Sequence, residues 1–368
     1  MIAVSLTRAQ DFKKALKSGA DYLELRTDYF TDQQLKHFVE RSTLPVIYTI
    51  KRPTRYLPNV AYIDRDSFHD YHRTPSYQLL DQVIKKISFP KIATQVNTVD
   101  DLYTLAKLQK KYGKKAIVIG MGELGMMTRV YNKSLLTYAS VSKTTATAAG
   151  QLTVAELKST RIFGLIGDDI QHSLSPKLHR GQPYRYQLWQ TDDLKKFMFV
   201  FNWFQLPGAS VTKPFKIDVM KYCDRLDSDA KKIGAVNTLV RRGKKLVGYN
   251  TDWMGVDKAI GKYLKGKTVL ILGRGGAAKA VAYAVKKNGG KLGTRFDVLV
   301  NATPVFDHLL LPAESLRGKI VMDCIYGKKT ELLKQAKRHG AKVVLDGLPM
   351  LRYQAIEQTK LFNGRYAR

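Results

Sequence analysis

The sequence is poor in cysteine, in acidic residues and in long apolar runs, and these shortages exclude several classes of protein. Cys223 and Cys324 are the only cysteines among 368 residues. They fit neither a disulfide framework nor a zinc site, and they suit a reducing compartment. No apolar run approaches the roughly 20 residues that span a membrane. The opening residues, MIAVSLTRAQ, lack the basic and long apolar segments of a signal peptide. We expect a cytoplasmic protein with no membrane partner and no metal.

The shortage of acidic residues leaves a large positive charge. The chain has 31 acidic and 62 basic residues and a formal net charge of +31. Such a balance favours a nucleic-acid or anionic-membrane partner. However, the basic residues are scattered along the chain in pairs such as Lys13 and Lys14, and no nucleic-acid-binding motif accompanies them. The pattern favours a solvated surface, and nucleic-acid binding is kept as an alternative.

The first half of the chain alternates short apolar runs with amphipathic stretches, which predicts an α/β fold with parallel strands. In a barrel of this class, functional residues lie at the carboxyl ends of the strands. The expected helices include Ala9–Lys17, Ser76–Ile87 and Val99–Tyr112. The expected strands are Ile2–Leu6, Tyr22–Leu25, Pro45–Ile50, Ala61–Asp64, Phe89–Thr94 and Ala116–Gly120.

The second half begins a new pattern near Arg161, after a predicted junction at Thr153–Thr160. The segment KTVLILGRGGAAKAVAYAVKK predicts a strand, a glycine turn and a helix. In that context the glycine pattern indicates dinucleotide binding, because backbone at such a turn approaches a pyrophosphate closely. The length of the chain allows two domains with separate cores.

Six segments of the first half resemble, in order, the type I 3-dehydroquinate dehydratases. They are VSL at Val4–Leu6, ELRTD at Glu24–Asp28, SFHDYHRTP at Ser67–Pro75, KIA at Lys91–Ala93, MGELGMMTR at Met121–Arg129 and TAAGQ at Thr147–Gln151. The resemblance implies that Lys91 forms a Schiff base with a ketone substrate. The resulting iminium acts as an electron sink for removal of the neighbouring proton.

The same resemblance implies the roles of other residues. His69 would be the general acid and base, and Arg129 would pair with the substrate carboxylate. We expect burial at the start of a strand to lower the pKa of Lys91. The groups implied to bind substrate hydroxyls or to orient the catalytic pair are Ser5, Glu24, Arg26, Thr147 and Gln151.

The first half also departs from that family. Lys51 stands where the family has an arginine, and a glycine-rich segment that should follow is absent. Asp64 and His69 should end two consecutive parallel strands, yet they are five positions apart, whereas a crossover needs about a dozen residues. We therefore expect a TIM-barrel-like domain that is shortened by about one strand and its helices.

The second half resembles the shikimate dehydrogenases from Arg161 onward. Its matching segments are GLIGDDIQHSLSPKLH at Gly164–His179, ASVTKPFK at Ala209–Lys216, IGAVNTLV at Ile233–Val240, GYNTDWMG at Gly248–Gly255, GRGGAAKA at Gly273–Ala280, NATP at Asn301–Pro304, DCIYG at Asp323–Gly327 and GLPMLRYQA at Gly347–Ala355. By resemblance, Lys216 and Asp252 handle the hydroxyl proton that accompanies hydride transfer. Substrate binding is implied for Ser173, Ser175, Thr212, Asn237, Tyr326 and Gln354.

The resemblance also implies the cofactor NADP. The residues expected to bind it are Gly273, Gly275, Gly276, Ala277, Asn301, Thr303 and Gly347. The family's second strand normally ends in a motif that grips the ribose and its 2′-phosphate. Between Gly289 and Phe296 there is no room for a strand and a helix, so we expect a shortened Rossmann-like lobe. Arg274 and Arg295 are the remaining cations for the phosphate.

Together these observations predict two domains, at residues 1–156 and 157–368. The second would comprise a substrate lobe at 161–255, a cofactor lobe at 256–345 and a C-terminal helix at 346–368 that returns to the substrate lobe. The predicted function is bifunctional, namely dehydration of 3-dehydroquinate followed by NADPH-dependent reduction of 3-dehydroshikimate, so the partners are small molecules. A shortened relative that is inactive, or that retains only dehydrogenase activity or ligand binding, is the alternative.

Overall fold

The computed structural model describes residues 1–54, 56 and 58–364, which form two compact units. The first unit comprises Met1–Ile162 and Pro183–Leu206, and the second comprises Phe163–Gln182 and Pro207–Arg368. The compact units therefore divide the chain differently from the predicted domains, because a segment of the predicted substrate lobe is grouped with the first unit. No helix among the described residues is both long enough and apolar enough to cross a membrane.

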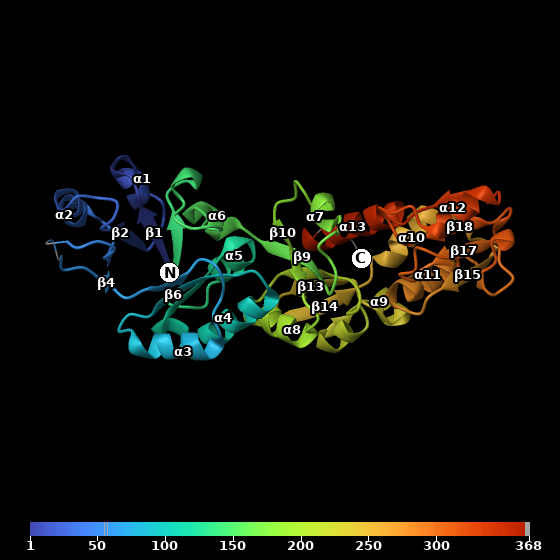
Figure 1. Ribbon diagram of the computed structural model, residues 1–368, viewed down its shortest axis with the longest axis horizontal. Helices are drawn as coiled ribbons and strands as arrows, with labels where there is room; N and C mark the ends of the chain where they lie inside the picture. The colour runs from blue at the N-terminus through green and yellow to red at the C-terminus, as the bar shows by residue number, and fades with distance from the viewer. Residues whose placement is uncertain (55, 57, 365–368) are drawn as a thin grey trace. The chain divides into compact units, whose positions relative to one another are not determined.

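Eight of the strands described in the first unit are parallel and form two sheets, parts of which are labelled in Figure 1. The five-stranded sheet has the order β4-β3-β2-β1-β8, and the three-stranded sheet has the order β5-β6-β7. The strands are β1 (Ile2–Leu6), β2 (Tyr22–Arg26), β3 (Val46–Thr49), β4 (Tyr62–Asp64), β5 (Phe68–Asp70), β6 (Lys91–Gln95), β7 (Ile117–Met121) and β8 (Thr137–Ser140). Two of these strands, β5 and β8, were not among the predicted strands.

The strand order is that of an eight-stranded barrel opened at two seams. A closed barrel would pair β4 with β5 and β7 with β8, and neither ladder forms among the described residues. At the second seam, the amide of Leu135 donates to the carbonyl of Ala116 at 2.9 Å. The barrel-like fold predicted for this half is thus found as open parallel sheets of eight strands, so the expected loss of about one strand is not found.

The short link between β4 and β5 corrects one prediction. Asp64 and His69 do lie on separate parallel strands, although only residues 65–67 connect those strands. The requirement for a long crossover applies to parallel neighbours in one sheet. Here β4 pairs with β3 and β5 pairs with β6, so a single extended stretch passes from the edge of one sheet to the edge of the other without a helix.

Helices surround these sheets, and their ends follow local sequence signals. In α4 (Val99–Tyr112), the Thr98 hydroxyl accepts from the Asp101 amide at 3.2 Å while the Asp101 carboxylate accepts from the Thr98 amide at 2.9 Å. This capping box fixes the start of the helix. The other elements of the unit are α1 (Phe12–Leu16), α2 (Asp32–Arg41), α3 (Tyr77–Lys86), α5 (Gly122–Val130), α6 (Val154–Ser159), β10 (Arg185–Gln190) and α8 (Leu194–Trp203).

The second unit contains a mixed sheet and a parallel sheet. Within the unit, the mixed sheet has the order β9-β11-β13-β14-β12, where β13 is antiparallel to both of its neighbours. Its strands are β9 (Ile162–Gly167), β11 (Gly208–Val211), β12 (Arg225–Leu226), β13 (Thr238–Arg242) and β14 (Lys245–Tyr249). Two short helices, α7 (Ser175–Leu178) and α9 (Ser228–Ile233), belong to the same part.

The parallel sheet has the order β16-β15-β17-β18-β19, which is a shortened Rossmann order. The order reverses between β15 and β17, and ligands of such sheets bind at that point. Its core is formed by residues such as Val269, Val281 and Val298. The elements are β15 (Thr268–Leu272), α11 (Gly276–Lys287), β16 (Lys291–Leu292), β17 (Val298–Asn301), β18 (Ile320–Asp323), α12 (Glu331–Arg338) and β19 (Val343–Leu345).

The second strand of this sheet refines the sequence prediction. A strand does follow α11, but β16 has only two residues and no helix lies between it and β17. The amide of Gly293 donates a hydrogen bond to the Val269 carbonyl at 3.1 Å. Only four residues later, the amide of Asp297, just before β17, donates to the Thr268 carbonyl at 2.8 Å. The strand therefore stops about three residues short of the end of β15, which leaves Leu272 partly exposed.

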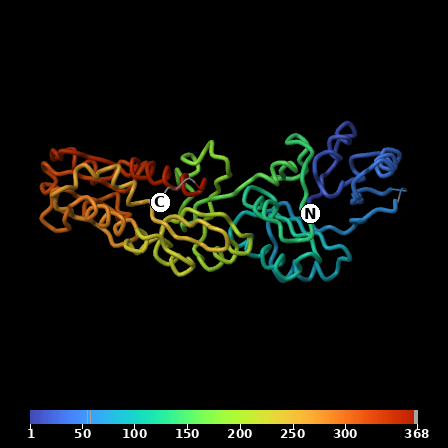
Figure 2. Tube along the Cα trace, turned by 180° about the vertical axis from the view of Figure 1, so that it is seen from behind, coloured from blue at the N-terminus to red at the C-terminus, as the bar shows by residue number. Residues whose placement is uncertain are grey.

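The last helix, α13 (Leu348–Phe362), lies beside α10 (Asp252–Ile260) in both views (Figures 1 and 2). It also contacts α7 and β13. A β-carbon on Gly255 would lie 2.5 Å from the Met350 carbonyl oxygen, so the two helices approach this closely only because position 255 is glycine. This approach places the first turn of α10 beside the first two turns of α13.

Candidate active sites

The first site is built around Lys91, the first residue of β6. Only 6% of this residue is exposed. Its Nζ lies 2.9 Å from Oδ2 of Asp64 at the end of β4, and 3.2 Å from Oε1 of Glu24 on β2. A buried ammonium is tolerated only with close opposite charge, because burial removes its hydration. Three strands from both sheets of the unit thus meet at one nitrogen atom.

Hydroxyl groups complete the hydrogen bonding of the two carboxylates. Glu24 accepts from Ser5 Oγ at 2.5 Å and from Thr49 Oγ1 at 3.0 Å, and Asp64 accepts from Ser67. Asp64 is buried, which raises its pKa, but Lys91 and Ser67 outweigh burial and hold the pKa below the ordinary aspartate value. Hydrogen bonds from hydroxyl groups and from Lys91 therefore hold both carboxylates in place.

The pKa of Lys91 does not shift in the expected direction. Burial does lower it, but Tyr138, Glu24 and Asp64 together outweigh that effect and hold it above the ordinary lysine value. The sequence-based expectation of a lowered pKa considered burial without the two carboxylates. In the resting site, Lys91 is an ammonium ion, so it must lose a proton before it can act as a nucleophile.

His69 lies on β5 and points to the same side as Lys91. Residues 69 and 93 are register partners in the parallel pairing of β5 and β6, and residues 91 and 93 share a face because side chains alternate along a strand. Burial, followed by the charges of Lys51 and Lys91, lowers the pKa of His69 to about 4. The imidazole is therefore neutral at neutral pH.

The remaining predicted residues of this site have other partners. Arg26 forms a two-point contact with Asp28, at 2.7 and 3.1 Å. Gln151 accepts from the amide and hydroxyl of Thr147 at 2.6 and 3.1 Å, and none of these described bonds reaches Lys91.

Arg129 is directed toward main-chain carbonyls. It is 4% exposed, and its guanidinium donates to the carbonyls of Gly120 at 3.1 Å and Tyr138 at 3.4 Å. Burial lowers its pKa to about 10, although the charge of Glu24 opposes this. Arg129 thereby connects the ends of β7 and β8, where no strand ladder forms among the described residues.

Several residues of this site were missed from the sequence. Asp64 ends a predicted strand, and a carboxylate at such an end is a usable signal, but nothing local indicated that it faces Lys91. Thr49 and Ser67 give no signal beyond ordinary hydroxyls. Tyr138 was missed because β8 itself was not predicted.

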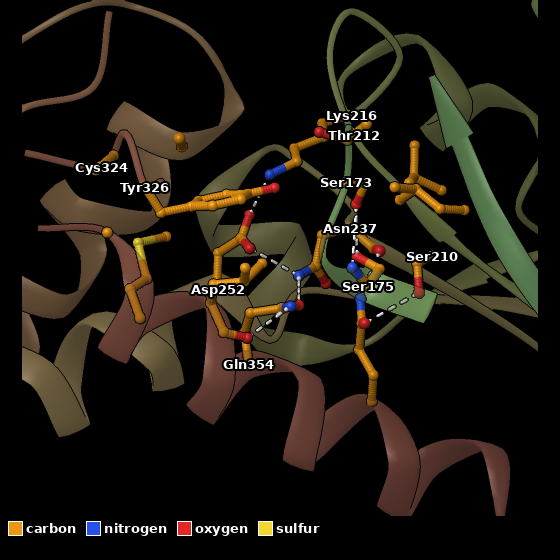
Figure 3. A pocket seen from close by; sticks show the side chains of 17 residues that line it. Ser173, Ser175, Ser210, Thr212, Lys216, Asn237, Asp252, Cys324, Tyr326 and Gln354 are labelled. Atoms are coloured by element: carbon orange, nitrogen blue, oxygen red, sulfur yellow. Dashed lines mark hydrogen bonds and ion pairs between the residues drawn. The ribbon is translucent and has the colours of Figure 1, made fainter. Parts of the chain in front are cut away.

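The second site is a cavity of about 180 Å³ in the second unit (Figure 3). Lys216 Nζ lies 2.6 Å from Oδ2 of Asp252, and Figure 3 shows the ring of Tyr326 beside this pair. The lining residues are Leu165, Ser173, Ser175, Ser210, Val211, Thr212, Lys216, Asn237, Asp252, Ala277, Cys324, Tyr326, Gly347, Met350, Leu351, Gln354 and Gln358. All six residues predicted to bind the second substrate are in this set.

An amide network holds Asp252 in place. Asn237 Nδ2 donates to Oδ1 of Asp252 and to Oγ1 of Thr251, both at 2.9 Å, and approaches Oε1 of Gln354 at 3.3 Å. Asp252 is the first residue of α10, where the helix dipole favours a negative charge. Oδ2 of the carboxylate thus faces Lys216 while Oδ1 is fixed by the amide.

A second glutamine supports this network and was missed from the sequence. Gln358 follows Gln354 by one turn of α13, so both face the cavity. Its Nε2 donates to the Asn237 carbonyl at 3.1 Å and to Thr238 Oγ1 at 3.0 Å, while its Oε1 accepts from Ser210 at 3.0 Å. Another missed residue, Cys324, lines the cavity, and burial raises the pKa of its thiol to about 12.

The glycine turn predicted to bind a dinucleotide lies at the reversal point of the parallel sheet. Gly273, after β15, has a φ of +113°, and a β-carbon there would lie 2.8 Å from the Ala302 carbonyl oxygen after β17. Gly276 begins α11, and a β-carbon there would lie 2.8 Å from Lys216 Cβ. Gly275 caps this twelve-residue helix and faces open space. Backbone amides at such a helix end suit a pyrophosphate.

The other predicted cofactor residues divide into two groups. Ala277 and Gly347 line the substrate cavity, so the glycine turn and the polar site share one space. Asn301 is buried and donates to Asp323 at 3.1 Å and to the Val305 carbonyl at 3.2 Å, and it accepts from Thr303 Oγ1 at 2.7 Å. The described bonds of Asn301 and Thr303 therefore order the loop after β17.

The cations that could bind the 2′-phosphate of NADP lie outside the enclosed cavity. Arg274 and Arg295 are both exposed, and neither lies in the cavity. Arg295 is in the tight turn after β16, and no acidic side chain lies in that turn between Gly293 and Phe296. A basic rather than an acidic group after the second strand fits a phosphorylated ribose.

The fold and the two sites define a two-part enzyme, with a lysine site in a parallel α/β unit and a dinucleotide-type site in the other. Two family models match the chain: type I 3-dehydroquinase at residues 66–163 and shikimate dehydrogenase substrate-binding domain at residues 165–239.

Individual proteins that are similar to the chain come from the same two families. The chain is 27% identical to an Arabidopsis thaliana bifunctional 3-dehydroquinate dehydratase/shikimate dehydrogenase, over 95% of this chain and 79% of the relative. It is 36% identical to the NADP⁺ shikimate dehydrogenase of Pyrococcus abyssi, over 56% of this chain and 93% of the relative. The solved Aquifex aeolicus shikimate dehydrogenase matches with a TM-score of 0.53 and 34% identity, covering 57% of this chain and 95% of that chain. The chain belongs to the shikimate dehydrogenase family, joined to a type I 3-dehydroquinase segment.

The low pKa of His69 generates a direct prediction. Its ring proton signal in NMR, assigned by loss in His69→Asn, should titrate near pH 4, because burial and two nearby ammonium groups disfavour the imidazolium. Lys51→Met should move the midpoint upward, toward the ordinary histidine value. Lys51→Arg keeps the charge and is the matched control, with a midpoint close to that of the parent. An ordinary midpoint in the parent would contradict the described environment.

Proposed function

We propose that the chain catalyses two consecutive reactions: dehydration of 3-dehydroquinate to 3-dehydroshikimate through a lysine imine, and NADPH-dependent reduction of 3-dehydroshikimate to shikimate. The observation that supports this most strongly is that one chain contains two separate lysine–carboxylate sites, each in a segment that resembles the corresponding enzyme. The product of the first reaction is the substrate of the second. We assign the reactions to residues 1–156 and 157–368, respectively.

In the dehydratase site, Lys91 would first transfer a proton along its existing hydrogen bond to Asp64 Oδ2. One N–H bond breaks and one O–H bond forms, which leaves a neutral amine. The amine adds to the substrate ketone, the proton held by Asp64 passes to the carbonyl oxygen so that it leaves as water, and the nitrogen becomes an iminium. His69, which is neutral, takes the proton from the carbon next to the iminium and later returns a proton to the departing hydroxyl. Arg129 is assigned to the substrate carboxylate, and Ser5, Arg26, Thr147 and Gln151 to its hydroxyls.

In the dehydrogenase site, Lys216 and Asp252 would hold the reacting hydroxyl and move its proton. The hydroxyl, amide and phenol groups of the cavity would bind the remaining hydroxyls and the carboxylate. NADP, when bound, supplies or accepts the hydride at the same carbon. Gly273, Gly275 and Gly276 would hold its pyrophosphate, with Ala277 and Gly347 beside the cavity and Asn301 and Thr303 across the turn.

Two alternatives rest on particular observations. The open seams of the first unit and the two-residue β16 favour a relative that has lost one or both activities. The net charge of +31 favours a polyanion partner, which salt-dependent retention on heparin would reveal. We also propose a cytoplasmic location, since both cysteines are free thiols. Incubation with 3-dehydroquinate and NADPH tests the main proposal, which requires both dehydroshikimate and shikimate to appear.

The imine generates the first functional prediction. Borohydride added during turnover of 3-dehydroquinate should reduce the imine and attach the substrate carbon skeleton to Lys91, as peptide mass spectrometry would show. Lys91→Met should abolish this labelling, while Lys86→Met, at the exposed end of α3, should leave it intact. A folded parent without an adduct, or with an adduct on another lysine, would exclude Lys91 as the imine residue.

The second prediction concerns the pair in the cavity. Lys216→Ala and Asp252→Asn should each lower kcat for shikimate oxidation about a hundredfold or more, as expected for positioned proton-transfer groups. Lys267→Met is the matched control, because the described contact of its side chain, with Asp297 at 3.9 Å, is long and exposed. Dehydratase activity should persist in all three variants. Near-parental oxidation by either cavity variant would show that the assigned pair does not move the proton.

The third prediction concerns cofactor choice. Exposed charge pairs contribute up to about 1 kcal/mol and are weakened by salt, so Arg274→Ala and Arg295→Ala should each weaken NADPH binding only about two- to fivefold. NADH binding should hardly change in either variant. The preference for NADPH should shrink as salt rises. Dissociation constants from fluorescence titration would decide this, and tight, salt-independent discrimination would require an enclosed phosphate pocket instead.

A further inference from the structure

The ring of Tyr138 lies directly beneath the nitrogen of Lys91. Lys91 Nζ is 4.1 Å from the ring centroid, well within the distance for a cation–π contact. The lysine side chain is only 7% exposed, so water does not screen this contact. The attraction between a cation and an aromatic face is largest in such desolvated places.

The ring is held rigidly in this position. Tyr138 is 4% exposed and is the register partner of Ala3, whose small side chain leaves room for the ring. It packs in a core cluster with Ile117 and Ile119 of β7. Burial raises the pKa of its phenol above the ordinary tyrosine value, so the ring stays uncharged. The phenol oxygen is buried and makes no hydrogen bond of ordinary geometry within the described part of the chain.

The nitrogen above the ring is cationic at two stages of the proposed dehydration. Before reaction it is an ammonium ion. When the neutral amine condenses with the ketone, a C–N bond forms and the carbonyl oxygen leaves as water with one hydrogen from the amine and the proton held by Asp64. The nitrogen retains one hydrogen and a positive charge. Removal of the adjacent proton by His69 converts the iminium to a neutral enamine. The hydroxyl then leaves as water with the proton that His69 returns, which restores an iminium. A preorganised partner for this charge favours the cationic states.

We propose that the aromatic face of Tyr138 is a further catalytic group of the dehydratase site, which stabilises the cationic nitrogen of Lys91 both as the ammonium and as the iminium. This inference rests on the proposed imine function. The ring acts together with Glu24 on β2 and Asp64 on β4, which bind the same nitrogen. His69 on β5 and Lys51 after β3 also face this charge, and Lys51 opposes it.

The ring is better suited to this role than a third carboxylate. Glu24 and Asp64 already supply two negative charges to one ammonium, and a third buried anion would lack a partner. An aromatic face attracts the cation without adding charge. The carbon face of the ring is not a Brønsted base, so it stabilises the iminium without taking a proton from it.

Fluorination of the ring tests the proposal without changing its shape. Tyr138→Phe should retain imine trapping within about threefold, because the face remains. Replacing that phenylalanine with its mono-, di- and trifluorinated analogues withdraws electron density from the face. Borohydride trapping with 3-dehydroquinate should then fall stepwise by on the order of tenfold across the series. Without substrate, acetic anhydride should label Lys91 progressively faster, because the ammonium is less stabilised.

The matched control is the same series at Tyr48, a buried residue whose ring packs edge-on against Tyr56. This series should change neither borohydride trapping of the imine nor acetic anhydride labelling of Lys91. Dehydrogenase activity of every variant reports that the chain is folded. A parent chain without any imine adduct would overturn the proposed dehydratase function itself. Two outcomes would overturn the role of the ring alone in a parent chain that does trap the imine. In one, imine trapping does not change across the fluorinated Tyr138 series. In the other, Tyr138→Phe is already as impaired as the trifluorinated variant.

Discussion

The cost of burying a lysine cation is the constraint on which the first unit depends. A buried ammonium loses its hydration, and only close opposite charges with good geometry compensate. Lys91 therefore requires Glu24 and Asp64, which come from strands far apart in the chain. The second unit meets the same requirement on a smaller scale, where Asp252 faces the half-buried Lys216 and an amide holds the carboxylate in place.

This constraint explains how the first unit brings the proposed catalytic groups together without a helix between β4 and β5. The extended stretch from β4 to β5 supplies both Asp64 and His69, so no intervening helix or crossover is needed to present them. The two sheets that it connects have no strand ladder at that seam among the described residues. Ion pairs to Lys91 therefore link the sheets where backbone pairing does not. In the parallel sheet of the second unit, by contrast, no described ion pair compensates for the short β16, and its neighbour β15 remains partly exposed.

Much of the fold and of both sites was accessible from the sequence, for physical reasons that differ between them. The glycine turn, its preceding apolar strand and its following helix are local features, and their period and composition predict them directly. All six predicted substrate residues of the second site line one cavity. The first site was predicted by resemblance of ordered segments, whereas Tyr138 escaped notice because β8 is a short run without a clear period.

The sequence by itself determined the chemistry available to this protein: two lysines, their candidate acids and the turn for a dinucleotide, all of which are set by residue type and local order. Only the tertiary structure decided how those groups act on one another. The direction of the Lys91 pKa shift, the aromatic face beneath its nitrogen and the support of Asn237 by Gln358 all depend on distances between residues remote in sequence. Electrostatic and hydrogen-bond energies vary with those distances, and a linear pattern does not specify them.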